Sequence, residues 1–274
     1  MQKKEAVTDT TIEKNTSELV SGIRNKRPVV LSITNMVTVN DCANILLAIG
    51  ASPIMAHAKE EVAEIVQKVD ALVLNLGATE YAEAMLIAGE TARKYNKPIV
   101  FDPVGVAAST YRRGLAYEII NRAKPDCIRG NYSEINALYH NHNTASGVDE
   151  CMESDKESTD IKDVVLAVAK NFSCIVIASG EVDVISDGNV VYQITGGSKM
   201  MRQITGAGCM SSVLLGAFLA VDSCLASAYA CLNVVNECAE AGEKKQKALN
   251  GGSMTFHDAF IDAVSLYKVK KSDK

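Results

Sequence analysis

The chain has 274 residues, 47% of them hydrophobic and 22% charged, and its formal net charge is -5. This composition is typical of a globular α/β protein and excludes a fibrous or largely disordered chain. The acidic balance argues against nucleic acid as the main partner, because binding to a phosphate backbone relies on clustered Lys and Arg. We therefore predict a single domain over residues 1–274 that acts on a small molecule.

The sequence contains no segment typical of export or of a membrane anchor. The first residues carry two lysines without an apolar stretch behind them, and arginine is too scarce for a transit peptide. We expect residues 1–16 to be flexible and the protein to be cytoplasmic. Asp222 interrupts the apolar run between Cys209 and Ala241 well short of the roughly 20 residues that a bilayer requires. That run therefore predicts two helices that meet near Val221, and no membrane span.

Short apolar runs alternate with helical patterns along most of the chain. The runs predict strands at 28–33, 70–76, 97–102, 127–131 and 173–179, and the patterns between them predict helices at 38–49, 79–95, 110–123, 132–140 and 160–171. Strands without polar alternation, separated by helices of this length, indicate a parallel sheet with helices on both faces. The expected fold class is α/β with a mostly parallel central sheet.

A β-hairpin is predicted near residues 182–195. Two alternating apolar segments flank Asp187 and Gly188, which form a two-residue turn signal. The sheet is therefore expected to be mixed. Residues 141–160 form one long polar stretch, which we interpret as a surface loop because strand and helix patterns continue on both sides of it.

Polar residues and glycines follow the predicted strands, at the edge where open parallel sheets bind ligands. After the last hairpin strand comes a glycine turn, Gly206, Ala207 and Gly208, which leads through Cys209 into an apolar helix. The first amides of such a helix have no intrahelical partner and lie at the positive end of its dipole, which makes an anion site. A tight turn that only begins a helix is the alternative. The position of the turn, facing the other strand ends, favours the anion site.

Asp102 and Glu134 are the acids best placed to act together. An acid at a strand end can hold Mg²⁺ through water, and Asn131 and Glu134 share one face at a helix start. The alternative for Glu134 is a capping partner of Asn131. Arg129, directly after a strand, could bind a phosphate with its planar donors, or it could form an ordinary surface salt bridge.

Six segments, taken together, resemble the hydroxyethylthiazole kinases. They are TNMVTVNDCANILLAIGASPIM (34–55), VLNLGA (73–78), FDPVG (101–105), RGNYSEI (129–135), ASGEVDVISDG (178–188) and ITGAGC (204–209). The resemblance implies the ribokinase-like fold and phosphorylation of 4-methyl-5-(2-hydroxyethyl)thiazole with MgATP, a salvage step in thiamine synthesis. It also implies a homotrimer with the thiazole bound between subunits.

The resemblance also implies roles for individual residues on the substrate side. Met55 and Gly208 match positions that contact the thiazole through their backbone amides, and Asn35 lies nearby in the same pocket. Cys209 takes the place where sugar kinases of the superfamily carry an aspartate base. Ala207 departs from the threonine that is usual in the family, so it keeps its N–H and loses a hydroxyl.

On the nucleotide side, Arg129 and Ser179 are similar to ATP-contacting positions of the family. Asp102 and Glu134 match acidic positions around Mg²⁺ and the phosphates, with Asn131 beside them. Ser179 stands where the family usually has threonine; it keeps a hydroxyl and an N–H, so we expect ATP binding to survive.

Three other functions stay open. Cys209, with a pKa lowered by the helix N-terminus, would suit a covalent nucleophile in acyl or redox chemistry. The fold could also carry a non-catalytic nucleotide-binding module. A kinase for hydroxymethylpyrimidine or pyridoxal is the third alternative, and the missing aspartate at position 209 argues against it.

Overall fold

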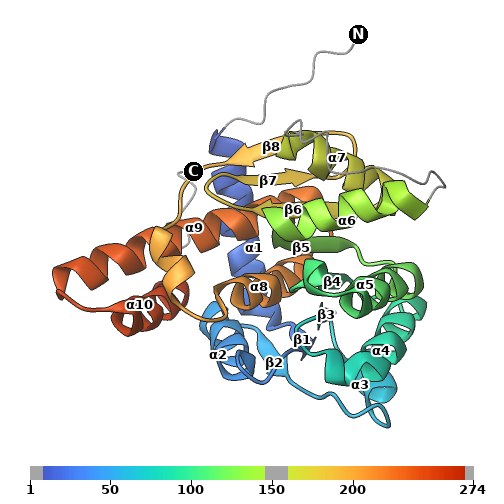
Figure 1. Cartoon of the computed structure of the whole chain (residues 1–274). Helices are drawn as coiled ribbons and strands as arrows, with labels where there is room; N and C mark the ends of the chain where they lie inside the picture. Colours follow the sequence, from blue (N-terminus) through green and yellow to red (C-terminus); the bar gives the residue numbers. More distant parts are fainter. Residues whose placement is uncertain (1–8, 146–159, 269–274) are drawn as a thin grey trace.

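The computed structural model describes residues 9–145 and 160–268, and within them one sheet runs through the molecule (Figure 1). Its eight strands lie in the order β2-β1-β3-β4-β5-β6-β7-β8. The strands are β1 (Val29–Ile33), β2 (Ser52–Ile54), β3 (Ala71–Asn75), β4 (Ile99–Asp102), β5 (Cys127–Asn131), β6 (Ile175–Ser179), β7 (Asp183–Ser186) and β8 (Val191–Ile194).

Neighbouring strands from β2 to β6 pair in parallel, whereas β6 with β7 and β7 with β8 pair antiparallel. The predicted mostly parallel sheet and the hairpin are therefore confirmed. The register between β3 and β4 places Asn75 beside Asp102, and that between β5 and β6 places Asn131 beside Ser179. Four polar residues thus meet at the carboxyl edge of the sheet.

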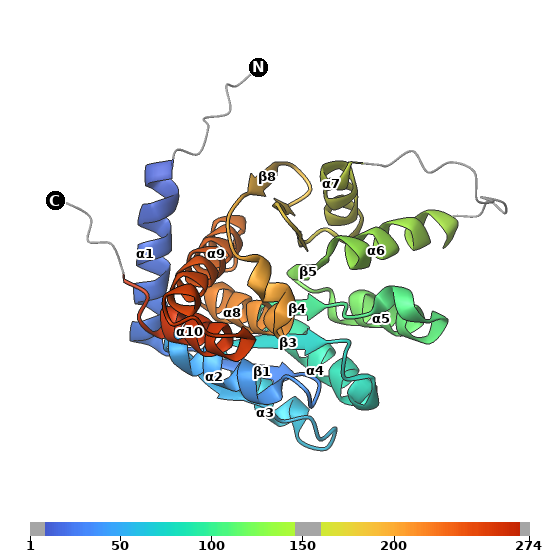
Figure 2. The same cartoon turned by 60° about the vertical axis from the view of Figure 1, so that its left-hand side comes forward.

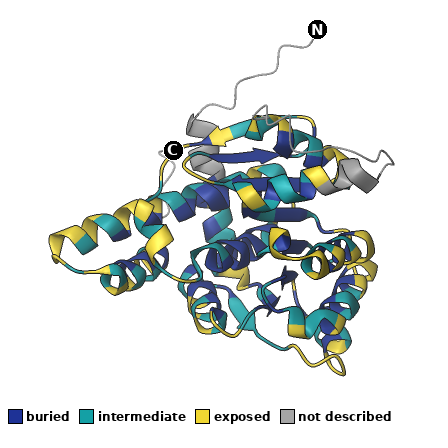
Figure 3. Ribbon diagram, viewed as in Figure 1, coloured by how far each residue is buried: buried dark blue, intermediate teal, exposed yellow. Residues whose placement is uncertain are grey.

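Helices cover both faces of the sheet (Figure 2). One layer holds α1 (Asp9–Lys26), α2 (Val39–Ile49), α8 (Ala207–Val221), α9 (Leu225–Ala248) and α10 (Ser253–Ser265); the other holds α3 (Val62–Lys68), α4 (Ala82–Lys94), α5 (Thr110–Ala123), α6 (Tyr132–Ala145) and α7 (Ile161–Phe172). Alternate strand residues pack into two separate cores, with Val73 in the first and Leu72 in the second. Strands buried on both faces must be apolar at every position, which is the pattern seen in the sequence. Figure 3 shows the central strands of the sheet buried; β3 and β4 are buried at every position, whereas the edge strands β2 and β8 are partly exposed.

Among the residues that the structure describes, three short 3₁₀ segments precede helices of these layers: η1 (Thr79–Tyr81), η2 (Val106–Ala108) and η3 (Lys199–Gln203). Among them, η3 leads from the hairpin toward α8. Helix α8 is apolar on nearly all sides because it is packed between the sheet and its neighbouring helices. It ends at Val221 and α9 begins at Leu225, as the position of Asp222 predicts. In the part of the chain that the structure describes, no helix is long and apolar enough to cross a membrane.

The structure corrects two predicted boundaries. Helix α1 begins at Asp9, inside the segment 1–16 that was predicted to be flexible, and Thr16 is already buried; residues 1–8 lie outside the described residues. Helix α6 continues to Ala145, so the predicted loop does not begin at 141. Residues 141–145 include no glycine or proline, so no strong helix breaker ends α6 before Ala145. Residues 146–159 of that loop lie outside the described residues, and Asp160 caps the N-terminus of α7.

Candidate active site

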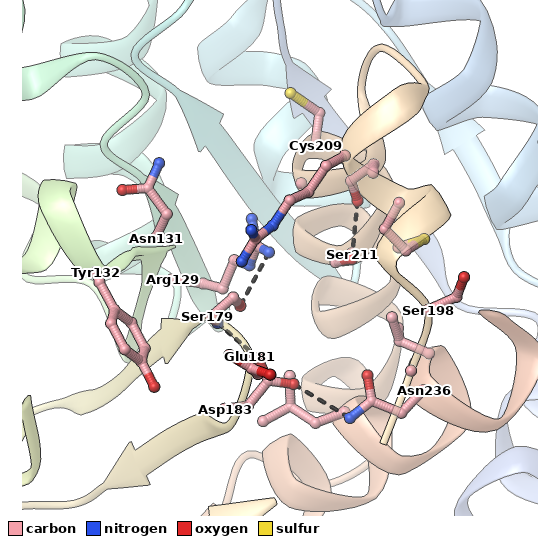
Figure 4. Close-up of a pocket in the computed structure, with 18 of the residues that line it drawn as sticks. Arg129, Asn131, Tyr132, Ser179, Glu181, Asp183, Ser198, Cys209, Ser211 and Asn236 are labelled. Carbon is pink, nitrogen blue, oxygen red and sulfur yellow. Dashed lines mark hydrogen bonds between the residues drawn. The ribbon is translucent and has the colours of Figure 1, made fainter. Parts of the chain in front are cut away.

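A cavity of about 1120 Å³ lies at the carboxyl ends of the central strands, between α6 on one side and η3 and α9 on the other. Nine of the sequence-predicted site residues line it: Asp102, Arg129, Asn131, Glu134, Ser179, Gly206, Ala207, Gly208 and Cys209. Figure 4 shows Arg129 pointing into the centre of this group, between Asn131 and Cys209. Residues far apart in the sequence therefore form one site.

The N-terminus of α8 forms one wall of the cavity. Gly206 is its N-cap residue, with φ 81° and ψ 2°, a left-handed conformation that favours glycine. A Cβ atom at this position would lie 2.8 Å from Thr38 Cγ2, so a side chain would also collide with its neighbour. No side chain caps the helix. The first amides of α8 are thus available to an anion in the cavity.

Arg129 lies against this helix start. A Cβ atom on Gly208 would be 2.7 Å from Arg129 Nη1, so the glycine lets the guanidinium approach the backbone. Arg129 Nη2 donates to Ser179 Oγ at 2.9 Å, whereas its Nε is buried and has no hydrogen-bond partner among the described residues. A buried donor without a partner costs free energy, so the guanidinium is held in this position at some cost to stability.

Asp102 is the buried acid of the site, with only 2% of its surface exposed. Its Oδ2 accepts hydrogen bonds from Ser212 Oγ at 2.6 Å and from Asn75 Nδ2 at 3.4 Å. Burial raises the pKa of Asp102 to about 6, a rise that Arg129 and the Ser212 hydrogen bond oppose. The carboxyl group is therefore mostly ionised at neutral pH, and it titrates at mildly acidic pH.

Glu134 is a capping residue in this structure. Its Oε2 accepts from the Asn131 amide at 2.8 Å, and the Glu134 amide donates to Asn131 Oδ1 at 2.9 Å. These two bonds form a reciprocal capping box at the start of α6. Glu134 Oε1 accepts from the Gly105 amide at 3.0 Å and so fixes the loop after β4. The capping alternative is thus present, and it holds the carboxylate at the cavity wall.

Cys209 is buried, with 8% of its surface exposed. Its Sγ accepts from Asn75 Nδ2 at 3.2 Å and from Asn35 Nδ2 at 3.7 Å. Burial, and the negative charge of Asp102, raise the pKa of this thiol. The expectation that the helix N-terminus lowers it is wrong, because desolvation outweighs the favourable interactions.

The two remaining predicted substrate residues lie outside the cavity lining. Asn35 reaches the site only through its contacts with Cys209 and with Asn75, whose Oδ1 accepts from Asn35 Nδ2 at 3.4 Å. Met55 follows the edge strand β2 and packs against the core, and its carbonyl is 3.4 Å from His57 Nδ1. The structure therefore does not bring Met55 to the cavity within one chain.

Sequence reasoning assigned no role to several residues that the structure places at the site. Asn75 bridges Asp102 and Cys209, and Ser212 holds Asp102. At the far end of the cavity Asp183 accepts from Asn236 Nδ2 at 3.2 Å (Figure 4). The sequence could have indicated Asn75, because it ends a buried strand, and Ser212, because it lies one helical turn after Gly208. No sequence feature indicated Asn236, which lies within a long helix.

The match to a family model decides which group of proteins the chain belongs to. The model of the hydroxyethylthiazole kinase family matches residues 20–271. The chain belongs to that family. A hydroxyethylthiazole kinase of Listeria monocytogenes is 43% identical over 256 residues, which cover 91% of this chain and 92% of the relative. One of Pyrococcus furiosus is 39% identical over 247 residues, which cover 89% and 90%.

Solved structures agree with this membership in the hydroxyethylthiazole kinase family. The hydroxyethylthiazole kinase protein of Pyrococcus horikoshii superposes with a TM-score of 0.80 at 34% identity, covering 92% of both chains. A ribokinase-like superfamily protein of Enterococcus faecalis superposes with a TM-score of 0.60 at 12% identity, covering 94% of this chain and 84% of that one. The second likeness shows the fold alone, and it confirms the predicted ribokinase-like class.

Proposed function

We propose that this protein is a hydroxyethylthiazole kinase, which transfers the terminal phosphoryl group of ATP to the hydroxyl of 4-methyl-5-(2-hydroxyethyl)thiazole in thiamine salvage. The observation that carries the proposal, together with family membership, is the glycine turn at the start of α8 with Arg129 lying against Gly208. Free amides and a guanidinium that converge on one cavity suit a migrating phosphate. We expect the reaction to take place in the cytoplasm.

The α8 amides are proposed to stabilise the phosphoryl group during transfer. Phosphoryl transfer passes through a loose transition state, in which positioning and charge stabilisation provide most of the catalysis. Donors that are already fixed by the helix need no reorganisation when charge develops. Arg129 steadies the nucleotide phosphates next to these amides, and Ser179 keeps the guanidinium in place through its hydrogen bond.

Cys209 and Asn35 are proposed to lie beside the hydroxyl of the thiazole. A thiol whose pKa is raised by burial is rarely deprotonated to the reactive thiolate at neutral pH. It can still accept or relay a hydrogen bond, and a loose transition state needs no strong base. The same raised pKa counts against the alternative in which Cys209 is a covalent nucleophile.

The acids of the cavity fit a magnesium ion that is shared with the nucleotide. Asp102 and Glu134 offer carboxylate oxygens, and Mg²⁺ is usually held by one or two carboxylates together with substrate phosphates. Residues 9–145 and 160–268 hold no group of three or more His, Cys, Asp or Glu able to bind a metal, which fits such sharing. When bound there, magnesium would neutralise charge on the phosphates. Asn75 and Ser212 orient Asp102 for this role.

We further propose that the protein is a homotrimer whose thiazole sites lie between subunits. Met36 and Val37, next to Asn35, are 76% and 74% exposed in the single chain. Adjacent exposed apolar side chains are typical of the centre of an interface. Because Met55 does not line the cavity of its own chain, a neighbouring subunit is needed if it is to contact the substrate.

An assay of ADP release over a panel of thiazole, hydroxymethylpyrimidine and pyridoxal alcohols tests the proposed function. We expect turnover with MgATP and the hydroxyethylthiazole, and a much lower kcat/KM with the other alcohols. The best turnover with one of the other alcohols would favour a different vitamin-precursor kinase. ATP binding without ADP release would favour the non-catalytic module.

The substitution Cys209→Asp separates the kinase from a thiol enzyme. A kinase should keep its activity or gain some, because an aspartate is the stronger base for the alcohol. A covalent thiol nucleophile would lose all activity. A thioester or thioether trapped on Cys209 during turnover would also exclude the proposed function.

A further inference from the structure

The 3₁₀ segment η3 (Lys199–Gln203) carries two cations on one side. A 3₁₀ helix has three residues per turn, so side chains at positions i and i+3 eclipse one another. Lys199 and Arg202 are three apart, both are exposed, and both line the cavity. In Figure 2 η3 is the short gold helix before α8. Residues of η3 and of the start of α6 both line the cavity.

The backbone around η3 is fixed to helix α9 and to the core. Gly196 and Gly197 have φ 126° and 83°, which turn the chain back toward the cavity after β8. The Gly197 amide donates to Glu240 Oε1 at 3.0 Å, and Ser198 Oγ donates to Glu243 Oε2 at 2.6 Å. Met200, Met201 and Ile204 pack against the core. The segment is therefore held at both ends, and it does not depend on its cations for its position.

The neighbouring acids already have other partners. Glu240 accepts the Gly197 amide, and Glu243 pairs with Lys247 besides accepting from Ser198. Within the described ranges, 9–145 and 160–268, the side chains of Lys199 and Arg202 form no hydrogen bond or ion pair. Both charges are thus unpaired at the wall of a cavity that also holds Asp102, Glu134, Glu181 and Asp183.

We propose that Lys199 and Arg202 bind the phosphates of the nucleotide that are not transferred. This inference rests on the proposed function, because it assumes that a nucleotide polyphosphate is the donor. In the proposed function the α8 amides and Arg129 bind the migrating phosphoryl group. Lys199 and Arg202 line the same cavity, and Arg202 precedes Gly206 by only four residues. Four carboxylates in one cavity repel a polyphosphate, and two added cations offset that repulsion.

The double variant Lys199→Gln/Arg202→Gln tests the proposal against the control Lys244→Gln/Arg113→Gln. The control removes the same charge from α9 and α5, at residues that do not line the cavity. We expect the KM for MgATP and the Kd for ADP measured by calorimetry to rise about tenfold or more in the first variant only, since hydrogen bonds to charged groups are strong. We expect the KM for the thiazole alcohol to stay within about twofold.

Salt provides an independent readout of the same contacts. The KM for MgATP of the wild-type protein should rise with KCl more steeply than that of the η3 variant, because screening weakens only interactions that are present. An ADP Kd within twofold of the control variant would overturn the proposal. If the wild-type protein turned over none of the alcohols, the proposed function would fail, while ADP binding would still decide the role of η3. If the wild-type protein did not bind ADP, both would be overturned.

Discussion

Asp102 has opposite effects on stability and on activity. Its folded pKa of about 6 lies above the ordinary value of 3.8 for an aspartate, so the ionised form is less favourable in the folded protein than in the unfolded chain. The cost is absent below pH 4, grows as the pH rises toward 6, and is constant above that value. One pKa unit corresponds to about 1.4 kcal/mol, so the burial of this charge costs on the order of 1 to 3 kcal/mol at pH 7.

We therefore predict that Asp102→Asn stabilises the protein while it removes activity. The free energy of unfolding at pH 7.5 should rise by about 1 to 3 kcal/mol, and the gain should shrink toward zero near pH 4. The kcat should fall on the order of a hundredfold, as it does when a single electrostatic group of an active site is lost. Urea unfolding at several pH values measures the first effect. A variant less stable than the wild-type protein at pH 7.5 would contradict this account of Asp102.

A substitution at Gly208 tests the close approach of the Arg129 guanidinium to the backbone at the start of α8. In Gly208→Ala the new Cβ would lie 2.7 Å from Arg129 Nη1, so the guanidinium must move away and its bond to Ser179 weakens. We predict that the KM for MgATP rises about tenfold. The control is Gly114→Ala on α5, where no atom lies within 4 Å of the added Cβ. That variant should keep the wild-type KM and gain up to about 1 kcal/mol of stability. Equal KM values in the two variants would exclude a role for this contact.

At the scale of elements, the start of α6 combines a helix cap with a candidate ligand. Glu134→Gln keeps an oxygen that can close the capping box, but it removes the charge. Glu134 accepts a second amide, that of Gly105, and this bond is lost in the variant. We therefore expect Glu134→Gln to be less stable than the wild-type protein by about 1 kcal/mol and to lose most of its activity. Glu134→Ala loses the charge and both amide bonds, so it should be less stable by about 2 kcal/mol. Full activity in Glu134→Gln would mean that the residue serves only as a cap.

The elements show where sequence reasoning succeeds. The predicted helix 110–123 and strand 127–131 match α5 and β5, because Ser109 caps the start of this helix and Pro125 follows its end. Strand β2 was missed because it has only three residues and contains Pro53. Helix α1 was missed because most of its residues are polar. Elements of these kinds depend on tertiary packing, which no local pattern encodes.

In the candidate site, too, sequence reasoning predicted the residues at strand ends and missed those that depend on tertiary packing. The strand-end rule predicted that Asp102, Arg129 and Ser179 lie together, and the structure brings them to one cavity. The pKa of Cys209 could not be predicted, because it depends on burial and on the distance to Asp102. Likewise Asn236 comes to the site only through the packing of α9 against the hairpin, which involves contacts between segments far apart in the sequence.

At the scale of the whole molecule, the proposed trimer predicts what surface substitutions do. Met36→Asp changes a side chain that is 76% exposed in the single chain, so the fold should survive while association fails. Analytical ultracentrifugation should give three times the 29.3 kDa of the chain for the wild-type protein and a single chain for the variant. The control Tyr111→Asp alters a 62% exposed residue on α5, in the other helical layer, and should stay trimeric. A wild-type protein that sediments as a monomer would contradict the trimer.

The central claim is that the amides at the start of α8 receive the migrating phosphate. The most direct test is a crystal structure with a non-hydrolysable ATP analogue, magnesium and the thiazole alcohol. We predict that the terminal phosphate lies within hydrogen-bond distance of the amides of residues 206–209 and of Arg129, with the alcohol oxygen beside Cys209. A terminal phosphate bound away from this glycine turn would contradict the account.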